Sequence, residues 1–387
     1  MRPRFFKGNR LQLLSNGSEY FPALLAAINT AQRDIFLETY IFADDETGRA
    51  VAQALSTAAE RGVAVHLLVD GFGSKEIIPK LAGQMLSPQV KVQVYHPQIS
   101  PFTLSHTPWR RLHRKLVVVD GRLAFVGGIN IIDDMHTPGL LPPRYDYAVR
   151  IEGPLLTVIV SEAVRLWNRT AWTNLHWQWL IPRRAAQTAA PGIGQQRVAL
   201  VVRDNLLHRA DIEGAYLAAL DQAREEVIIA NAYFFPGQHF RRALVRAAGR
   251  GVRVALLLQG RQEYLLLHYA TRALYGQLLD AGVEIYEYHK SFMHAKVAVV
   301  DHAWATVGSS NIDPFSLLLA REANLIVDDA GFAGELRKSL VRHMEEGAQV
   351  VAKPQWHQQP LSRRVVIWCA YGVTRFLIGL AGYAGRH

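Results

Sequence analysis

Apolar and polar positions along this chain alternate between a helical spacing and a strand spacing. Residues 21–33 carry an apolar stripe at helical spacing, and the strand-like run 35–42 follows. A second helix is expected over residues 47–61, closed by Gly62, because glycine commonly ends helices at this position. Residues 63–69 are almost continuously apolar, as expected for a strand buried on both faces. The alternation predicts an α/β fold with a largely parallel or mixed sheet flanked by helices.

The same order of segments returns in the second half of the chain, which indicates an internal duplication. We therefore expect two α/β units related by a pseudo-two-fold axis. The matched segments are AQRDIFLETYIF from Ala31 with AREEVIIANAYFF from Ala223, AAERGVAVHLLVD from Ala58 with AAGRGVRVALLLQ from Ala247, and VKVQVYHP from Val90 with GVEIYEYH from Gly282.

A boundary between the two units is predicted within residues 173–196. This stretch is first rich in tryptophan and then small and polar, with proline and glycine, which is typical of a crossover linker. The predicted division has a first domain over residues 1–180, a linker over 181–197, a second domain over 198–350 and a C-terminal segment over 351–387.

Composition narrows the class of protein. The chain has 387 residues, half of them hydrophobic and a fifth charged, which excludes a disordered chain. Its 43 basic and 33 acidic residues give a formal charge of +10, which favours either nucleic acid or anionic lipid as a partner. The single cysteine, Cys369, excludes an intramolecular disulfide framework and fits a reducing compartment. No secretory signal and no spanning segment before residue 360 are visible, so the body is expected to be soluble or peripheral.

The strongest chemical signal is a composite motif that closes each repeat with the same spacing. The first copy reads HRKLVVVDGRLAFVGGIN and contains His113, Lys115, Asp120, Gly128 and Asn130. The second copy reads HAKVAVVDHAWATVGSSN and contains His294, Lys296, Asp301, Ser309 and Asn311.

The spacing explains why such a motif suits a phosphate group. If residues 112–119 form a strand, His113 and Lys115 project from the same face. Asp120-Gly121 favours a tight turn into a partner strand at 123–126, and the glycines that follow allow backbone amides to approach an anion. A single His-x-Lys strand is usually surface decoration, but two matched copies in a duplicated chain favour a function.

These residues resemble the signature of the phospholipase D superfamily, His-x-Lys-x4-Asp followed by Gly-Gly/Ser-x-Asn. The resemblance covers residues 16–346. Within the superfamily the chain is similar to the bacterial cardiolipin synthases, most of all the short type B enzymes, through LETYIF, GGIN, NAYFFP and VGSSNIDPFSL. It is expected to lack the N-terminal membrane helices of the longer synthases.

The resemblance implies that the two histidines meet between the repeats. One would attack phosphorus and form a phosphohistidine, while the other protonates the departing oxygen and later deprotonates the incoming alcohol. His113 is assigned as the nucleophile, although the pseudo-symmetry gives the sequence no means of choosing. Two lysines and two asparagines would bind the phosphate oxygens, assisted by Gly128 and Ser309.

The resemblance also implies partners for the histidines. Asp146 and Glu322 follow the two motifs at the places where the family keeps an acid that orients the imidazole, with a surface salt bridge as the alternative. Asp120 and Asp301 are expected to organise the motif hairpins. No metal and no cofactor are expected, since the cationic and amide groups replace a metal ion.

Two surfaces are candidates for membrane contact. In residues 364–386, Arg364, Arg375 and Arg386 share one face of a helix, and apolar residues fill the opposite face. A spanning helix would place Arg375 near the bilayer centre at a cost of about 2.5–3.5 kcal/mol, whereas an interfacial helix avoids this cost. An ordinary helix packed on the core is the alternative. The second candidate is a tryptophan cluster, to which the loops 97–111 and 135–143 add apolar residues; the cluster comprises Trp167, Trp172, Trp177 and Trp179 with Arg183 and Arg184.

The expected function is cardiolipin synthesis from phosphatidylglycerol. Anionic membrane phospholipids are the expected partners and nucleic acid is not, with the chain peripheral on the cytoplasmic face of a bacterial inner membrane. Two alternatives remain open: a phosphodiesterase or nuclease of the same superfamily with water as acceptor, and a non-catalytic membrane-binding protein. The donor and acceptor lipids and the oligomeric state are left open by the sequence.

Overall fold

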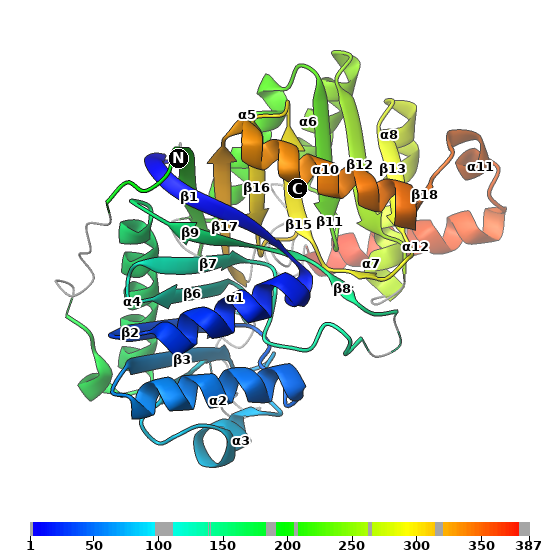
Figure 1. The fold of residues 1–387 in the computed structure, drawn as a ribbon. Helices are drawn as coiled ribbons and strands as arrows, with labels where there is room; N and C mark the ends of the chain where they lie inside the picture. Colours follow the sequence, from blue (N-terminus) through cyan, green and yellow to red (C-terminus); the bar gives the residue numbers. More distant parts are fainter. Residues whose placement is uncertain are drawn as a thin grey trace.

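The computed structural model describes residues 3–96, 111–137, 139, 141–182, 191–204, 208–261, 265–313 and 320–378. Two α/β halves follow one another along the chain (Figure 1). The first half contains β1 (Phe6–Ser15), α1 (Asn16–Thr30), β2 (Asp34–Thr39), α2 (Glu46–Glu60), β3 (Ala64–Asp70), α3 (Ile78–Lys80), the π-helical turn η1 (Leu81–Met85), β4 (Lys91–Tyr95), β5 (Arg111–Leu112), β6 (Lys115–Val119), β7 (Leu123–Gly127), β8 (Arg144–Tyr145), β9 (Tyr147–Glu152), α4 (Leu156–Thr173) and the 3-10 turn η3 (Trp177–Trp179).

The second half repeats this order and then adds C-terminal helices. It contains β10 (Gln196–Arg203), α5 (Asp211–Gln222), β11 (Glu226–Asn231), α6 (Gln238–Gly249), β12 (Arg253–Gln259), α7 (Leu265–Arg272), α8 (Tyr275–Asp280), β13 (Glu284–Tyr288), β14 (Phe292–Met293), β15 (Lys296–Val300), β16 (Trp304–Gly308), β17 (Ala320–Asp328), α10 (Ala330–Gly347), β18 (Ala348–Val350), α11 (Lys353–His357) and α12 (Leu361–Ile378).

The helix α2 shows how local sequence sets these elements. Asp45 caps its first turn, because the carboxylate accepts a hydrogen bond from the backbone N–H of Gly48 at 2.8 Å. Gly62 follows the last turn with φ +93°, a conformation that favours glycine and lets the chain turn directly into β3. The helix expected at 47–61 is therefore present within one residue at each end.

The strands of the two halves run in mirrored order on one hydrogen-bonded path. The path is β18-β13-β12-β11-β15-β16-β17-β10-β1-β9-β7-β6-β2-β3-β4, with β1 and β10 antiparallel at its centre. In each half three strands are parallel and the rest are antiparallel, so the sheet is mixed. The predicted duplicated α/β fold with a pseudo-two-fold axis is confirmed.

Alternate residues along each strand pack into different hydrophobic cores. Leu116 and Val118 face a core shared by both halves, which also holds α4 and α10, whereas Val117 and Val119 face α1 and α2. In the second half α5, α6 and α8 cover the outer face of the sheet. The shared core fixes one half against the other, so residues that lie between the two halves are held in place.

The prediction of one continuous strand over residues 112–119 is wrong. The strand is broken at His113 and Arg114, and β5 and β6 pair with different neighbours: β5 with β17 and β6 with β2 and β7. The break occurs because β5 leaves its own half and joins the other one. A corresponding break separates β14 from β15 at His294 and Ala295, where β14 joins β8.

Several predicted segments lie partly outside the described residues. These are the insert at 97–110, Arg183 and Arg184, and the end of the C-terminal helix from residue 379. Within the predicted boundary stretch 173–196, η3 lies beside α4, and β10 already begins at Gln196, inside the predicted linker.

Candidate active site

Asp120 and Asp301 close equivalent turns between the two motif strands. Each aspartate has a positive φ and points back to the start of the neighbouring strand. The Asp120 carboxylate accepts hydrogen bonds from the backbone N–H groups of Arg33 and Asp34 at 2.7 and 3.1 Å. Asp301 does the same with Glu225 and Glu226 at 2.8 and 3.0 Å. These contacts fix the hairpins, which is the structural role expected of both aspartates.

The two histidines lie where each half crosses into the other. The backbone N–H of His113 donates to the Arg321 carbonyl at 3.0 Å, and that of His294 donates to the Tyr145 carbonyl at 2.8 Å. The next residues along these acceptor strands are Glu322 and Asp146. The exchanged strands therefore carry each histidine to an acid of the opposite half.

Each imidazole is held by one of these acids. His113 Nδ1 lies 2.9 Å from Glu322 Oε1, and His294 Nδ1 lies 2.7 Å from Asp146 Oδ2. Glu322 is fully buried and Asp146 nearly so. A carboxylate at Nδ1 favours the tautomer in which the proton is on Nδ1. Nε2 of each ring is then unprotonated and available to react. The alternative of surface salt bridges at Asp146 and Glu322 is wrong, because both acids are buried against histidine.

Lys115 and Lys296 occupy equivalent places beside the histidines. Lys115 Nζ donates to the His113 carbonyl at 2.6 Å, and Lys296 Nζ donates to the His294 carbonyl. Lys296 is 0% exposed and also lies 3.6 Å from Asp146 Oδ2. Two ammonium groups at the bottom of the site would attract an anionic ligand strongly, since burial weakens solvent screening.

The pKa values show that the two motifs share one electrostatic environment. Burial lowers the pKa of His113, against the opposing charge of Glu322, and Lys296 from the other half lowers it further. Burial, Lys296 and then Lys115 hold the pKa of His294 well below its ordinary value. Burial also lowers the pKa of Lys115 to about 7. An arriving phosphodiester would raise these values again, because an opposite charge favours the protonated forms.

The remaining motif residues divide between two tasks. Asn130 is buried, and its Oδ1 accepts the Ile41 N–H at 3.1 Å, which leaves the amide nitrogen as its phosphate-binding end. Asn311 is buried at the equivalent place after β16. Phosphate binding by both asparagines stays a prediction.

Gly128 and Ser309 contact the orienting acids. The Gly128 N–H already donates to the Tyr147 carbonyl at 2.9 Å, and a Cβ on Gly128 would lie 2.3 Å from Asp146 Oδ1. The Ser309 hydroxyl donates to Glu322. Glycine thus makes room for one acid and serine binds the other, while direct phosphate binding by Gly128 and Ser309 stays a prediction.

Comparisons with known proteins agree with the duplicated phosphate-handling motif seen in this site. A family profile described as "Cardiolipin synthase, PLD-like domain" matches residues 24–151 and again 216–344, which together make more than half of the chain. Cardiolipin synthase B of Escherichia coli K12 is 42% identical over 88% of this chain and 81% of its own length. The chain belongs to the phospholipase D-like cardiolipin synthase family. Cardiolipin synthase 1 of Staphylococcus epidermidis is a more distant member, 27% identical over 92% of this chain and 72% of its own length. The resemblance to the type B enzymes is confirmed.

A solved structure supports the fold of this family member. The crystal structure of phosphatidylserine synthase from Haemophilus influenzae Rd KW20 covers 99% of this chain and 97% of its own, with a TM-score of 0.70. Its sequence identity of 12% means that this likeness concerns the fold alone.

The sequence reasoning missed an ion pair that distinguishes the two halves of the synthase. Arg114, next to His113, is buried and donates two hydrogen bonds to the buried Glu38. The second half has Ala295 and Ala230 at the corresponding positions. Aligning the two repeats shows both charges lost together, which is the signal that could have revealed the pair.

Tyr40 is a second residue that the motifs do not include. Its ring centroid lies 4.9 Å from that of His113, and Lys115 Nζ lies 5.5 Å from the Tyr40 centroid. The ring therefore packs on both motif residues and limits their movement. Its place in LETYIF was visible only as a family cue.

Proposed function

We propose that this family member is a cardiolipin synthase that transfers a phosphatidyl group from phosphatidylglycerol to a hydroxyl of a second phospholipid and releases glycerol. The observation that carries the proposal is the pair of histidine–carboxylate contacts, each built from both halves, beside two buried lysines. The product is supported by the 42% identity to cardiolipin synthase B.

In the proposed mechanism, one imidazole Nε2 attacks phosphorus while the other ring protonates the departing glycerol oxygen. The P–O bond breaks and a P–N bond forms. The second ring, now neutral, then accepts the proton of the incoming hydroxyl, whose oxygen replaces the imidazole on phosphorus. Lys115, Lys296, Asn130 and Asn311 stabilise the phosphate oxygens in both steps. We assign His113 as the nucleophile and His294 as the acid and base.

Lipid analysis of purified protein with phosphatidylglycerol vesicles tests this function. We expect cardiolipin and glycerol as the main products, with little phosphatidic acid. Because the reaction is reversible, high glycerol should suppress net cardiolipin formation. If phosphatidic acid dominates instead, water is the acceptor and the chain is a phosphodiesterase. Binding to DNA in preference to vesicles would favour the nuclease alternative.

Chelation gives a separate prediction. Among the described residues, no group of three His, Cys, Asp or Glu side chains is placed to hold a metal ion. We expect the rate of cardiolipin formation to stay within about twofold in excess EDTA, because lysine and asparagine donors carry the phosphate charge. A loss of activity that one divalent ion restores would contradict this expectation.

The outer face of α12 is the surface that we propose contacts the membrane. Ile367, Ala370 and Thr374 pack inward, and α12 lies against α7. The outer face, in contrast, is apolar and exposed, with Trp368 at 60% and Phe376 at 66%. No helix within the described ranges is long and apolar enough to cross a bilayer.

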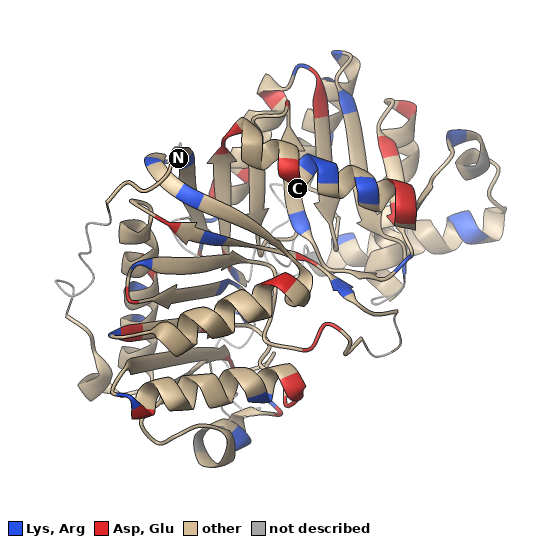
Figure 2. Cartoon of the chain, viewed as in Figure 1, with Lys and Arg blue, Asp and Glu red and all other residues tan. Residues whose placement is uncertain are grey.

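Charge on this segment suits an anionic membrane. Residues 353–387 contain lysine and arginine but no aspartate or glutamate. Figure 2 shows basic and acidic positions interspersed over both halves, whereas α12 carries only basic ones. Each such cation near an anionic surface contributes about 1 kcal/mol. We infer that the protein binds anionic phospholipids peripherally, on the cytoplasmic face of a bacterial inner membrane.

The tryptophan cluster contains both buried and exposed side chains. Trp167 is buried, and its indole N–H donates to the Trp179 carbonyl at 2.9 Å. Trp172 and Trp177 are exposed, but η3 lies beside α4, away from α12 (Figure 1). The cluster and α12 therefore do not form one continuous contact surface.

Replacing Val373 and Phe376 together with serine should weaken vesicle binding at least about 100-fold. The reason is that burying each apolar side chain contributes about 1.5–3 kcal/mol. The ratio of transfer to hydrolysis should fall as well, because water then reaches the intermediate more easily. Leu175→Ser with Trp177→Ser is the matched control at the other exposed apolar surface. Vesicle co-sedimentation measures the binding of both variants. Unchanged binding of the α12 variant, or a larger loss in the control, would contradict the assignment. Truncation before Arg363 should show the same losses, although it also uncovers α7.

A further inference from the structure

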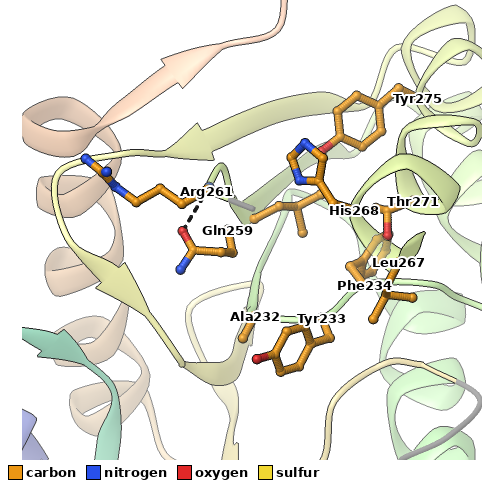
Figure 3. A pocket seen from close by; sticks show the side chains of 10 residues that line it. Ala232, Tyr233, Phe234, Gln259, Arg261, Leu267, His268, Thr271 and Tyr275 are labelled. Atoms are coloured by element: carbon orange, nitrogen blue, oxygen red, sulfur yellow. Dashed lines mark hydrogen bonds between the residues drawn. The ribbon is translucent and has the colours of Figure 1, made fainter. Parts of the chain in front are cut away.

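A pocket beside the second motif has no counterpart in the catalytic mechanism described so far. It lies at the ends of β11 and β12, under α7, is partly open to solvent, and has a cavity volume of about 30 Å³. In Figure 3, Gln259 and Arg261 lie on one side, His268 and Thr271 lie on the other, and Tyr233 lies below. A cavity of this volume takes one or two hydroxyl-sized groups, since about 10–15 Å³ is enough for one water molecule.

The pocket wall is connected directly to the chain that carries His294. The Ala232 N–H donates to the Ala295 carbonyl at 3.0 Å, and Gln259 Nε2 donates to the Met293 carbonyl at 3.2 Å. Both contacts are one residue from His294, on either side of it. The pocket wall is therefore hydrogen-bonded to both chain neighbours of the second catalytic histidine.

The lining offers neutral hydrogen-bonding groups. Thr271 is 9% exposed, and among the described residues the structure gives neither its hydroxyl nor the His268 ring a hydrogen-bond partner. Burial and nearby arginines lower the pKa of His268 to about 4, so its ring is neutral at pH 7. The guanidinium of Arg261 is occupied by the His289 carbonyl. Neutral donors and acceptors suit hydroxyl groups better than a phosphate.

The equivalent place in the first half is built from different residues. Asp70 replaces Gln259 there, and its carboxylate accepts the N–H groups of Leu112 and Gly73 at 2.7 and 2.9 Å. A Cβ on Gly73 would lie 2.4 Å from the Tyr40 carbonyl oxygen, so this loop packs tightly against Tyr40. The two halves thus share the phosphate-binding motif but differ beside it, so the donor and the acceptor molecule would meet different surroundings.

We propose that this pocket binds the polyol headgroup of the acceptor, with His268 and Thr271 holding the hydroxyls that do not react. This inference rests on the proposed transferase function. The bound polyol would present its remaining hydroxyl to the phosphohistidine: its oxygen forms the new P–O bond, the P–N bond breaks, and the proton passes to the other catalytic histidine. The pocket thereby favours a polyol over water as acceptor.

Soluble acceptors test the pocket without a second lipid. With phosphatidylglycerol vesicles, labelled glycerol exchanges into phosphatidylglycerol, whereas ethanol gives phosphatidylethanol. Ethanol has only the hydroxyl that reacts. We expect Thr271→Val and His268→Leu each to raise the half-saturating glycerol concentration about fivefold, the effect of one lost neutral hydrogen bond. Ethanol transfer should be unchanged.

Tyr269→Phe is the matched control, because Tyr269 lies on α7 but does not line the pocket. It should leave both reactions unchanged, and thermal unfolding of every variant should match that of the wild type. Equal loss of glycerol and ethanol transfer would overturn the proposal, as would unchanged glycerol saturation. Failure of the proposed function is a different result, since the wild type would then form neither cardiolipin nor labelled phosphatidylglycerol.

Discussion

Replacing His113 or His294 with alanine is expected to lower the rate of cardiolipin formation at least about 1,000-fold. Each ring is required in both chemical steps, either as the phosphorus ligand or as the proton carrier, and such roles contribute factors of this size. The fold should survive, because the backbone contacts of His113 and His294 to the opposite half do not depend on their side chains. Thin-layer analysis of labelled lipid and a thermal unfolding curve measure the two effects.

The variants also decide which histidine is the nucleophile. If His113 is the nucleophile, His294→Ala should slowly accumulate a phosphohistidine on His113 during long exposure to labelled donor, because both the acid of the first step and the base of the second step are absent. Mass spectrometry of the acid-sensitive adduct locates it. An adduct on His294 in the His113→Ala variant would reverse our assignment.

His302→Gly is the matched control for these substitutions. His302 occupies the turn of the second motif hairpin with φ +59°, where the first motif has Gly121. Glycine adopts this conformation without steric cost, so the variant should keep full activity and stability. Activity above a tenth of the wild-type rate in either catalytic histidine variant would contradict a shared active site.

The repeated spacing predicted the site because identical hairpins place identical residues. His113, Lys115 and Asp120 lie within eight residues, so they stay close together even though the strand is broken at His113, and the second copy repeats the relation. The duplicated α/β fold was predictable for the same reason. What local pattern could not show is the exchange of β5 and β14, which depends on how the halves pack.

That exchange explains the errors of the sequence reading. His294 and Asp146 are 148 residues apart in the chain, and His113 and Glu322 are 209 apart. No periodicity relates residues at such separations. The contacts of Gly128 and Ser309 have the same origin. Gly128 lies against Asp146 and Ser309 against Glu322, and each of these acids binds the histidine of the opposite half. A single sequence shows the residue types at these positions but not which acid they meet.

Replacing Asp146 with asparagine or Glu322 with glutamine is the second large effect that we expect, a loss of about 100- to 10,000-fold in rate. An amide can turn its NH2 towards Nδ1, which favours the wrong tautomer and removes the negative charge beside a buried imidazole. Glu322 raises the pKa of His113, so Glu322→Gln should lower this pKa further. Less of the ring is then protonated at pH 7, and the pH profile should shift towards lower pH.

The crossed arrangement of these pairs has its own signature in nitrogen-15 NMR spectra of histidine-labelled protein. Asp146→Asn should change the Nδ1 signal of His294, and Glu322→Gln should change that of His113, although each acid belongs to the other half. Asp328→Asn is the matched control on β17, because its exposed pair with Arg197 contributes at most about 1 kcal/mol and lies away from the histidines. If Asp146→Asn altered His113 and left His294 unchanged, the exchange of β5 and β14 would not exist in solution. The two halves would then each hold their own histidine and acid, and the shared phosphate site would have to be abandoned.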